Sequence, residues 1–253
     1  MSNIQDYYYH EVRDLQVPII FSHDVLTSHN QLAFHNFKIL GGNNYIFVDS
    51  STKHNIVAIV TFTSFEEEFN LDLIEDFQKV AHWLKKVSSV YGKITGHGTQ
   101  GGKMIADGWR KSQDKEAFGR YKPRKIDLKV PQNRVIYNEM NEEVKSIDLF
   151  VGNRFQLIAN KAFEESHRQL KYIGASSFGE MTHQEPIKSH QFSSNMTFTF
   201  EDFHNNYHKD EDFSNYYYGI WIPVELEKFN LVKKKNHMGL KEGLLCLQAT
   251  NVE

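Results

Sequence analysis

Two long stretches of the chain carry apolar residues at steps of three and four positions. Residues 66–91 show this spacing at Phe69, Leu73, Phe77, Val80, Leu84 and Val87. Residues 138–171 show it at Met140, Val144, Ile147, Phe150, Phe155, Ile158 and Ala162. This period places the apolar side chains on one face of an α-helix. The pattern therefore predicts two amphipathic helices, with Gly152 as the candidate break that divides the second.

Elsewhere the pattern is typical of β-strands. Residues 196–203 alternate apolar and polar side chains, as a strand with one buried face does, and residues 216–223 predict the next strand. β-Branched residues are dense over 55–63, which predicts a central strand. Gly41-Gly-Asn-Asn interrupts an extended stretch over 36–49, which favours a hairpin. Further strands are expected over 18–22, 103–110 and 126–130.

The order of these elements predicts an α+β fold with sheet on both sides of the helices. The 19 Phe, 12 Tyr and 3 Trp suit an aromatic-rich core. Residues 228–253 differ in character, because a stretch rich in Lys and Asn precedes a short apolar run and no strand is predicted there. We therefore expect one domain over residues 1–227 and a tail of uncertain origin over residues 228–253.

Composition and charge narrow the class of protein. The 253 residues carry 29 Lys and Arg against 32 Asp and Glu, so no global field draws the chain to nucleic acid or an anionic membrane. The basic residues between Lys103 and Lys125 are still compatible with a local basic patch. The single Cys246 excludes an intrachain disulfide and a cysteine-based metal cage. With no apolar span and no signal-peptide pattern, we expect an intracellular protein, nuclear or cytoplasmic, of open oligomeric state.

A histidine and a carboxylate two positions apart offer two ligands for one metal ion on an extended chain. His208-Lys-Asp210 and His183-Gln-Glu185 both have this spacing, and chance predicts roughly 1.6 such pairs for this content of His and acids. Context separates them. His208 directly follows the strand 196–203, where a jelly-roll oxygenase needs its first two ligands, whereas His183 lies in a polar loop. Of the two pairs, context favours His208 and Asp210 as the candidate metal ligands, but spacing and context alone favour a solvated polar turn there over a metal site.

Several segments of the sequence are similar to motifs of one protein family. They are Phe203-His-Asn-Asn-Tyr-His-Lys-Asp-Glu-Asp, Tyr218-Gly-Ile-Trp, Gly101-Gly-Lys-Met-Ile-Ala-Asp-Gly-Trp-Arg-Lys-Ser, Phe118-Gly-Arg-Tyr and Ser193-Ser-Asn-Met-Thr-Phe-Thr. In matching order, from Ile56 to Trp221, the chain resembles the fungal Tet-like 2-oxoglutarate/Fe(II) oxygenases of the Tet/JBP superfamily.

The resemblance implies a double-stranded β-helix, or jelly-roll, core with packed helices. It implies that His208 and Asp210 hold Fe(II), that 2-oxoglutarate chelates the same ion, and that a C–H bond of the substrate is hydroxylated. In the better-known branches the substrate is the methyl group of 5-methylcytosine or thymine in DNA. Such a base must be flipped out of the duplex, so nucleic acid carrying a modified base is the implied partner.

The chain departs from the family pattern at its C-terminal end. The pattern requires a distal His and, beyond it, an Arg that binds the far carboxylate of 2-oxoglutarate. The one His after Asp210 is His237, the last Arg is Arg168, and Lys is a poor replacement for a bidentate clamp. We therefore expect a jelly roll that is truncated at its C-terminal end. It is either a dioxygenase or an inactive relic of the domain that serves as a binding module.

Some residues keep two interpretations. Arg110 is the candidate ligand for the cosubstrate or for a nucleic-acid phosphate, and a surface Arg on a strand is the alternative. Trp109 and Trp221 are expected in the core rather than as platforms for base stacking. His204 is either a partner near the metal or an exposed side chain. A zinc hydrolase that uses His183, Glu185 and His190 is a remoter alternative.

Overall fold

The computed structural model describes residues 7–12, 44–49, 56–63, 65, 70–94, 99–111, 118–183, 185–205, 214–232 and 242–250. The chain divides into two compact units, Met1–Glu67 and Glu68–Glu253. The strands predicted over 18–22 and over the first part of 36–49 lie outside the described residues.

The first unit holds a three-stranded sheet in the order β1-β2-β3. Its strands are β1 (Tyr7–Val12), β2 (Asn44–Asp49) and β3 (Ile56–Val60). β2 pairs with β1 in parallel and with β3 in antiparallel orientation. The strand predicted over 55–63 is therefore confirmed as β3, but in the described sheet it lies at the edge and not at the centre.

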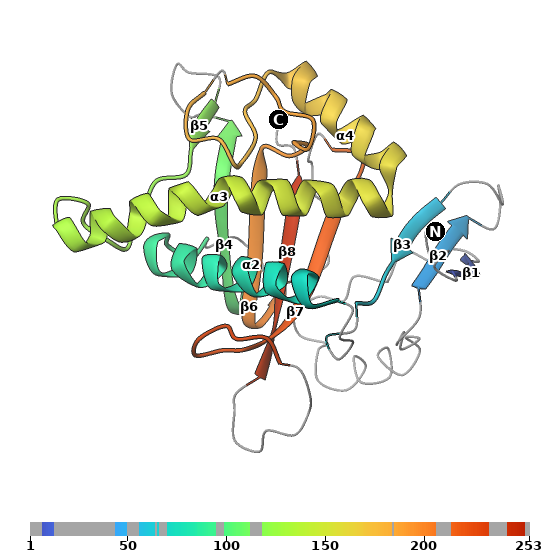
Figure 1. Cartoon of the computed structure of the whole chain (residues 1–253), viewed down its shortest axis with the longest axis horizontal. Helices are drawn as coiled ribbons and strands as arrows, with labels where there is room; N and C mark the ends of the chain where they lie inside the picture. Colours follow the sequence, from blue (N-terminus) through green and yellow to red (C-terminus); the bar gives the residue numbers. More distant parts are fainter. Residues whose placement is uncertain are drawn as a thin grey trace. The chain divides into compact units, whose positions relative to one another are not determined.

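The second unit holds three helices and a five-stranded sheet in the order β5-β4-β6-β8-β7, in which all neighbours are antiparallel (Figure 1). The helices are α2 (Leu71–Val90), α3 (Pro131–Ile158) and α4 (Asn160–Ile173). The strands are β4 (Thr99–Lys111), β5 (Phe118–Arg120), β6 (Asn195–Asn205), β7 (Tyr218–Glu225) and β8 (Glu242–Thr250). Among the described residues, no helix is long and apolar enough to cross a membrane.

Helices α2 and α3 lie across one face of this sheet (Figure 1). The indole Nε1 of Trp83 on α2 donates to the carbonyl oxygen of Met140 on α3 at 2.9 Å. The ring of Phe155 on α3 stacks on Tyr218 of β7, with centroids 4.9 Å apart. Each buried aromatic side chain adds a large apolar area to this interface, so the amphipathic faces read from the sequence are the faces that form the core.

Both predicted helices are confirmed, but the second is divided at Ala159 and not at Gly152. A side chain at Gly152 would place its Cβ 1.9 Å from the carbonyl oxygen of His190. Gly152 therefore stays inside α3 and admits the close passage of a loop. The helix ends instead where Ala159 adopts a non-helical φ of −148°.

The strand predicted over 126–130 is wrong. These residues form turns, in which the Val130 N–H donates to the carbonyl oxygen of Asp127 at 3.1 Å. Pro131 is the first residue of α3. Proline is favoured at that position because its φ is already helical and its missing N–H has no partner there in any helix. The proline thus starts a helix and does not border a strand.

The expectation that residues 228–253 contain no strand is also wrong. β8 lies inside the sheet, where Gln248 pairs with Thr197 of β6 on one side and with Gly219 of β7 on the other. The run Leu244-Leu-Cys-Leu lacks the alternation of apolar and polar residues that is typical of an antiparallel strand, so periodicity does not predict β8. The boundary expected after residue 227 falls between β7 and β8, which pair along the whole of β7.

A jelly roll requires two sheets that face one another. The described residues of the second unit form one sheet with helices on one face, so the fold is α+β with antiparallel sheet, and the closed jelly roll stays a prediction. On the other face the side chain of Trp221 is 59% exposed. The core position expected for Trp109 is confirmed at 6% exposure, whereas that expected for Trp221 is wrong.

Candidate functional site

The route of the chain into His208 and Asp210 is set by β6. Both residues follow β6 directly and lie outside the described residues. β6 and β7 each pair antiparallel with β8, so they run in the same direction. The chain therefore leaves the sheet at Asn205 and re-enters it at the opposite end, at Tyr218. The two candidate metal ligands belong to this connection.

Gly101 and Gly102 of β4, here called the glycine block, lie against the end of β6. Gly102 has a φ of +62°, and a Cβ there would lie 2.4 Å from the backbone nitrogen of Phe203. The ladder is irregular on both sides of Gly101, and Glu201 on β6 also has a positive φ, of 59°. Only glycine allows the two backbones to approach this closely with that φ. The block therefore fixes the direction in which β6 leaves the sheet toward His208.

Arg110 lies toward the opposite end of β4. Its backbone pairs with Gly119 of β5, and its guanidinium carbon lies 5.3 Å from the centre of the Tyr121 ring. Gly108 pairs with Asn195 and Thr99 with Asn205, so the ladder between them spans roughly 30 Å at ~3.3 Å per residue. The assignment of Arg110 to 2-oxoglutarate stays a prediction, and its contacts are those of an arginine on a strand.

A buried ion pair joins β4 to β5. The Arg120 Nη2 donates to both carboxylate oxygens of Asp107, at 3.0 and 3.1 Å, and Asp107 is fully buried. The Arg120 Nη1 donates to the carbonyl oxygens of Phe178 and Glu180, and the Trp109 indole N–H reaches the same Glu180 oxygen. Arg120 therefore holds two strands and a loop together. The sequence signal for Asp107 was a lone carboxylate in an apolar strand, which requires a buried partner.

A second buried polar group lies between α3 and the loop before β6. The Asp148 Oδ2 accepts hydrogen bonds from the Ser177 hydroxyl at 2.8 Å and from the Gln191 amide at 2.9 Å. The same amide donates to the Glu180 Oε1, which also pairs with Lys188. Burial raises the pKa of Asp148 to about 7, although both hydrogen bonds oppose the shift. The carboxyl group of Asp148 is thus protonated in part at neutral pH.

Stability is therefore expected to fall as the pH rises from about 4 to about 8. A carboxyl group whose pKa rises from 3.8 to about 7 on folding stabilises the fold fully below pH 3.8 and loses that effect through pH 7. Urea unfolding at several pH values measures how the free energy of unfolding changes with pH. Each unit of pKa difference between the folded and unfolded states contributes about 1.4 kcal/mol to the total change. Asp148→Asn should flatten this dependence on pH, while Asp72→Asn, on the exposed start of α2, should not. An equal slope in wild type and Asp148→Asn would contradict the prediction.

The residues of the zinc alternative do not meet. The ring of His183 stacks on Phe118 at 5.8 Å, and the Glu185 carboxylate accepts a hydrogen bond from Thr182. The Nε2 of His190 lies 3.9 Å from the Asp148 Oδ2. Within the part of the chain that the structure describes, no three His, Cys, Asp or Glu side chains are placed to hold a metal ion. The zinc interpretation is therefore wrong for this trio.

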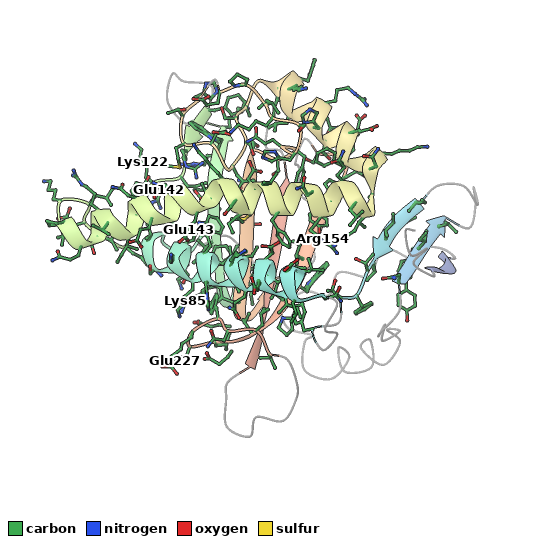
Figure 2. The ribbon with its side chains drawn as sticks, in the orientation of Figure 1. Lys85, Lys122, Glu142, Glu143, Arg154 and Glu227 are labelled. Atoms are coloured by element: carbon green, nitrogen blue, oxygen red, sulfur yellow. The ribbon has the colours of Figure 1, made fainter. Side chains whose placement is uncertain are left out.

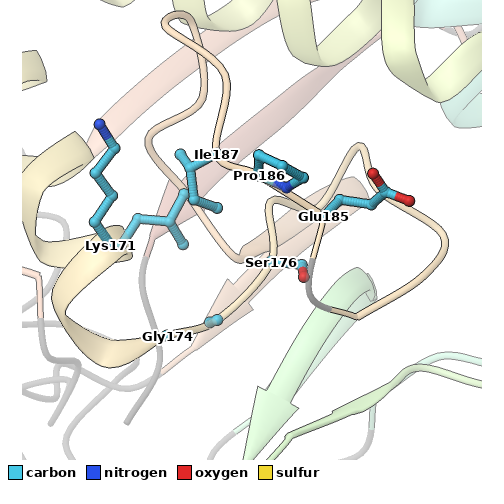
Figure 3. Close-up of a pocket in the computed structure, with 8 residues that line it drawn as sticks. Lys171, Gly174, Ser176, Glu185, Pro186 and Ile187 are labelled. Carbon is cyan, nitrogen blue, oxygen red and sulfur yellow. The ribbon is translucent and has the colours of Figure 1, made fainter.

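A surface pocket of about 250 Å³ lies at the C-terminal end of α4. Figure 3 shows Lys171 and Glu185 on opposite sides of it, with Pro186 and Ile187 between them. Leu170, Gly174, Ala175 and Ser176 complete its lining. None of these residues is a candidate ligand for iron or 2-oxoglutarate.

Comparison with known proteins identifies the family. The family model of the Tet-like 2OG-Fe(II) oxygenase superfamily matches residues 71–252, well over half of the chain. The match begins at the first residue of α2 and extends past β8, so it includes His208, Asp210 and the whole five-stranded sheet. Comparisons with curated proteins and with solved structures give no significant match. On the family match, the chain belongs to the Tet-like 2OG-Fe(II) oxygenase superfamily.

Proposed function

We propose that the chain is an Fe(II)- and 2-oxoglutarate-dependent dioxygenase that hydroxylates a C–H bond, with His208 and Asp210 as metal ligands. The family match over residues 71–252 carries the proposal, because it contains this pair and the strand that leads to it. The glycine block of β4 supports it further, since Gly102 allows the close backbone approach that directs the end of β6.

The donor set fits the metal. One imidazole nitrogen and one carboxylate oxygen are two of the three ligands in the facial triad of non-haem Fe(II) oxygenases. When bound, iron and 2-oxoglutarate together supply the activation of O2 that C–H oxidation needs. His208 and Asp210 would supply two of the ligands that hold this metal. His237 is the histidine available beyond them in the sequence.

The substrate that we propose is a methylated nucleobase in nucleic acid. A methyl group on a stacked base is out of reach of a metal inside a protein, so the base has to leave the stack to react. This substrate follows from the superfamily to which the chain belongs. The setting is intracellular, nuclear or cytoplasmic, as expected for an enzyme of nucleic acid with a single cysteine.

The test is the visible charge-transfer band that appears when 2-oxoglutarate chelates protein-bound Fe(II) under anaerobic conditions. Wild type should show the band, and His208→Ala and Asp210→Ala should lose it. His183→Ala is the matched control, because His183 has the same spacing to an acid but lies against Phe118 and Trp109. No band in wild type, or a band unchanged in His208→Ala, would refute the proposal.

A binding module without turnover is the second candidate, and one observation favours it. The chain has no Arg beyond Arg168 to clamp the far carboxylate of 2-oxoglutarate. Succinate formation in the presence of DNA that contains 5-methylcytosine separates the two functions. Succinate formation together with conversion of the 5-methyl group to a 5-hydroxymethyl group supports the dioxygenase. A protein that binds this DNA without forming succinate is the module.

A further inference from the structure

We propose that Lys85, Lys103 and Lys125 form a binding site for the phosphodiester backbone of nucleic acid, and we call these residues the lysine cluster. The inference rests on the proposed function, because it names the contact by which the substrate of that reaction is held. The three lysines are distinct from the candidate metal ligands, and all of them belong to the second unit.

Two aromatic rings position the cluster. The Nζ of Lys85 on α2 lies 5.0 Å from the centre of the Phe229 ring, and the Nζ of Lys103 on β4 lies 5.5 Å from that of Phe200. The two rings meet edge to face at 5.3 Å. Cation–π contacts of this kind attract an ammonium group to the face of the ring and so favour one placement of it. Both lysines are therefore oriented before any ligand arrives.

Lys125 completes the cluster from the segment between β5 and α3. Its Nζ donates to the carbonyl oxygen of Ser88 at the end of α2, at 2.6 Å. Burial lowers its pKa, and the neighbouring charges of Lys103 and Lys85 lower it further, against an opposite effect of Glu201. The ammonium groups of Lys103 and Lys85 therefore both act as like charges on that of Lys125. Crowded like charges cost free energy that a bound anion relieves.

The carboxylates near the cluster do not neutralise it. Glu201 pairs with Lys103 at 2.7 Å, and both side chains remain about two-fifths exposed, so the pair is screened by water. Figure 2 shows Lys85 and Glu227 on the same side of the unit. The surrounding sequence is strongly basic: residues 85–134 carry 13 Lys and Arg against four Asp and Glu, in a chain of net charge −3. An anion with several phosphates complements this excess.

The cluster also lies toward the end of the sheet from which the chain continues to His208. Lys103 pairs with Phe200 of β6, and the strand ends at Asn205. At ~3.3 Å per residue, these two positions on β6 are roughly 17 Å apart. A nucleic acid held at the cluster therefore lies roughly 17 Å along β6 from Asn205, the last residue of the strand that precedes the candidate metal ligands in the sequence. An anionic membrane or an acidic protein has no such reason to lie there.

The experiment compares DNA affinity at several salt concentrations by fluorescence anisotropy, with a short fluorescein-labelled duplex that contains 5-methylcytosine. The triple variant Lys85→Gln, Lys103→Gln, Lys125→Gln should bind more weakly. Its dependence of log affinity on log salt should be shallower by about 2.7, or ~0.9 for each lost phosphate contact. Between 50 and 200 mM salt this corresponds to a roughly 40-fold smaller change in affinity.

The matched control removes the same charge elsewhere, through Lys145→Gln, Lys161→Gln and Lys171→Gln on the exposed faces of α3 and α4. This variant should keep the wild-type salt dependence, and the triple Lys→Arg variant of the cluster should keep it as well. Thermal unfolding checks that each variant folds. Equal losses in both Gln variants, or none in the cluster variant, would overturn the inference. So would wild-type binding to phosphatidylserine vesicles in preference to DNA.

The charge-transfer band separates this inference from the proposed function. A cluster variant that keeps the band and loses DNA affinity supports both. A cluster variant that keeps the band and full DNA affinity refutes the lysine cluster alone. Absence of the band in wild type refutes the proposed reaction, while cluster-dependent DNA binding in the same preparation still supports the cluster.

Discussion

Replacement of Arg120 by Met is expected to lower the free energy of unfolding by about 3–5 kcal/mol. The change removes both hydrogen bonds to Asp107, whose carboxylate is fully buried. It also removes the donors to the carbonyl oxygens of Phe178 and Glu180. A buried charge without a partner is among the most costly defects that one substitution can create. Urea unfolding followed by circular dichroism measures the difference.

Arg110→Met provides the control for this prediction. Arg110 lies on the same strand pair, but its guanidinium carbon lies 5.3 Å from the centre of the Tyr121 ring, a cation–π contact whose loss should cost about 1 kcal/mol or less. The double variant Asp107→Leu, Arg120→Met should recover part of the stability, because apolar side chains can replace a buried ion pair. A cost for Arg120→Met that is no larger than that for Arg110→Met would contradict the prediction.

The sequence predicts the elements whose pattern is local. The three- and four-residue spacing identifies α2 and α3, and the alternation over 196–203 identifies β6, because each buried face follows from one element alone. The family wording also marks Gly101-Gly-Lys-Met and Phe118-Gly-Arg-Tyr. It does not say why they matter. Their roles, a close backbone approach at Gly102 and an ion pair at Arg120, depend on partners far away in the sequence.

What the sequence misses depends on neighbours in the sheet. β8 is an inner strand that lacks clear alternation, so its apolar run after a Lys-rich stretch gives no distinct strand signal. Trp221 alternates with Ile220 and Ile222, and the pattern alone cannot show which side of β7 meets the helices. Its exposure follows from the position of α3, where Phe155 packs on the other side of the strand against Tyr218.

The two candidate metal ligands are known from the sequence and not from the structure. His208 and Asp210 come from spacing, from the strand before them and from resemblance, and the family match includes them. Their assignment as ligands stays a prediction, because they lie outside the described residues. The structure adds the scaffold that precedes them. In that scaffold Gly102 is the residue whose role in positioning the ligands can be tested separately from the ligands themselves.

Gly102→Ala is expected to destabilise the second unit by about 2–5 kcal/mol and to weaken the charge-transfer band with Fe(II) and 2-oxoglutarate. Its φ of +62° is unfavourable for alanine, and the new Cβ would lie 2.4 Å from the backbone of Phe203. The atoms nearest to this Cβ all belong to the backbone of Phe203 and Glu201, so no side-chain rotation relieves the clash. The end of β6 has to move, and His208 and Asp210 follow it directly. Urea unfolding and anaerobic titration measure the two effects.

Gly174→Ala separates backbone strain from this clash. Gly174 ends α4 with a φ of +70°, and a Cβ there meets nothing within 4 Å. Alanine at this position should cost about 1 kcal/mol and leave the band intact, since it carries the same strain without a contact. If Gly102→Ala is as mild as Gly174→Ala, the close approach is not rigid. If Gly102→Ala destabilises the fold but keeps the full band, the glycine block stabilises the sheet without positioning the metal ligands.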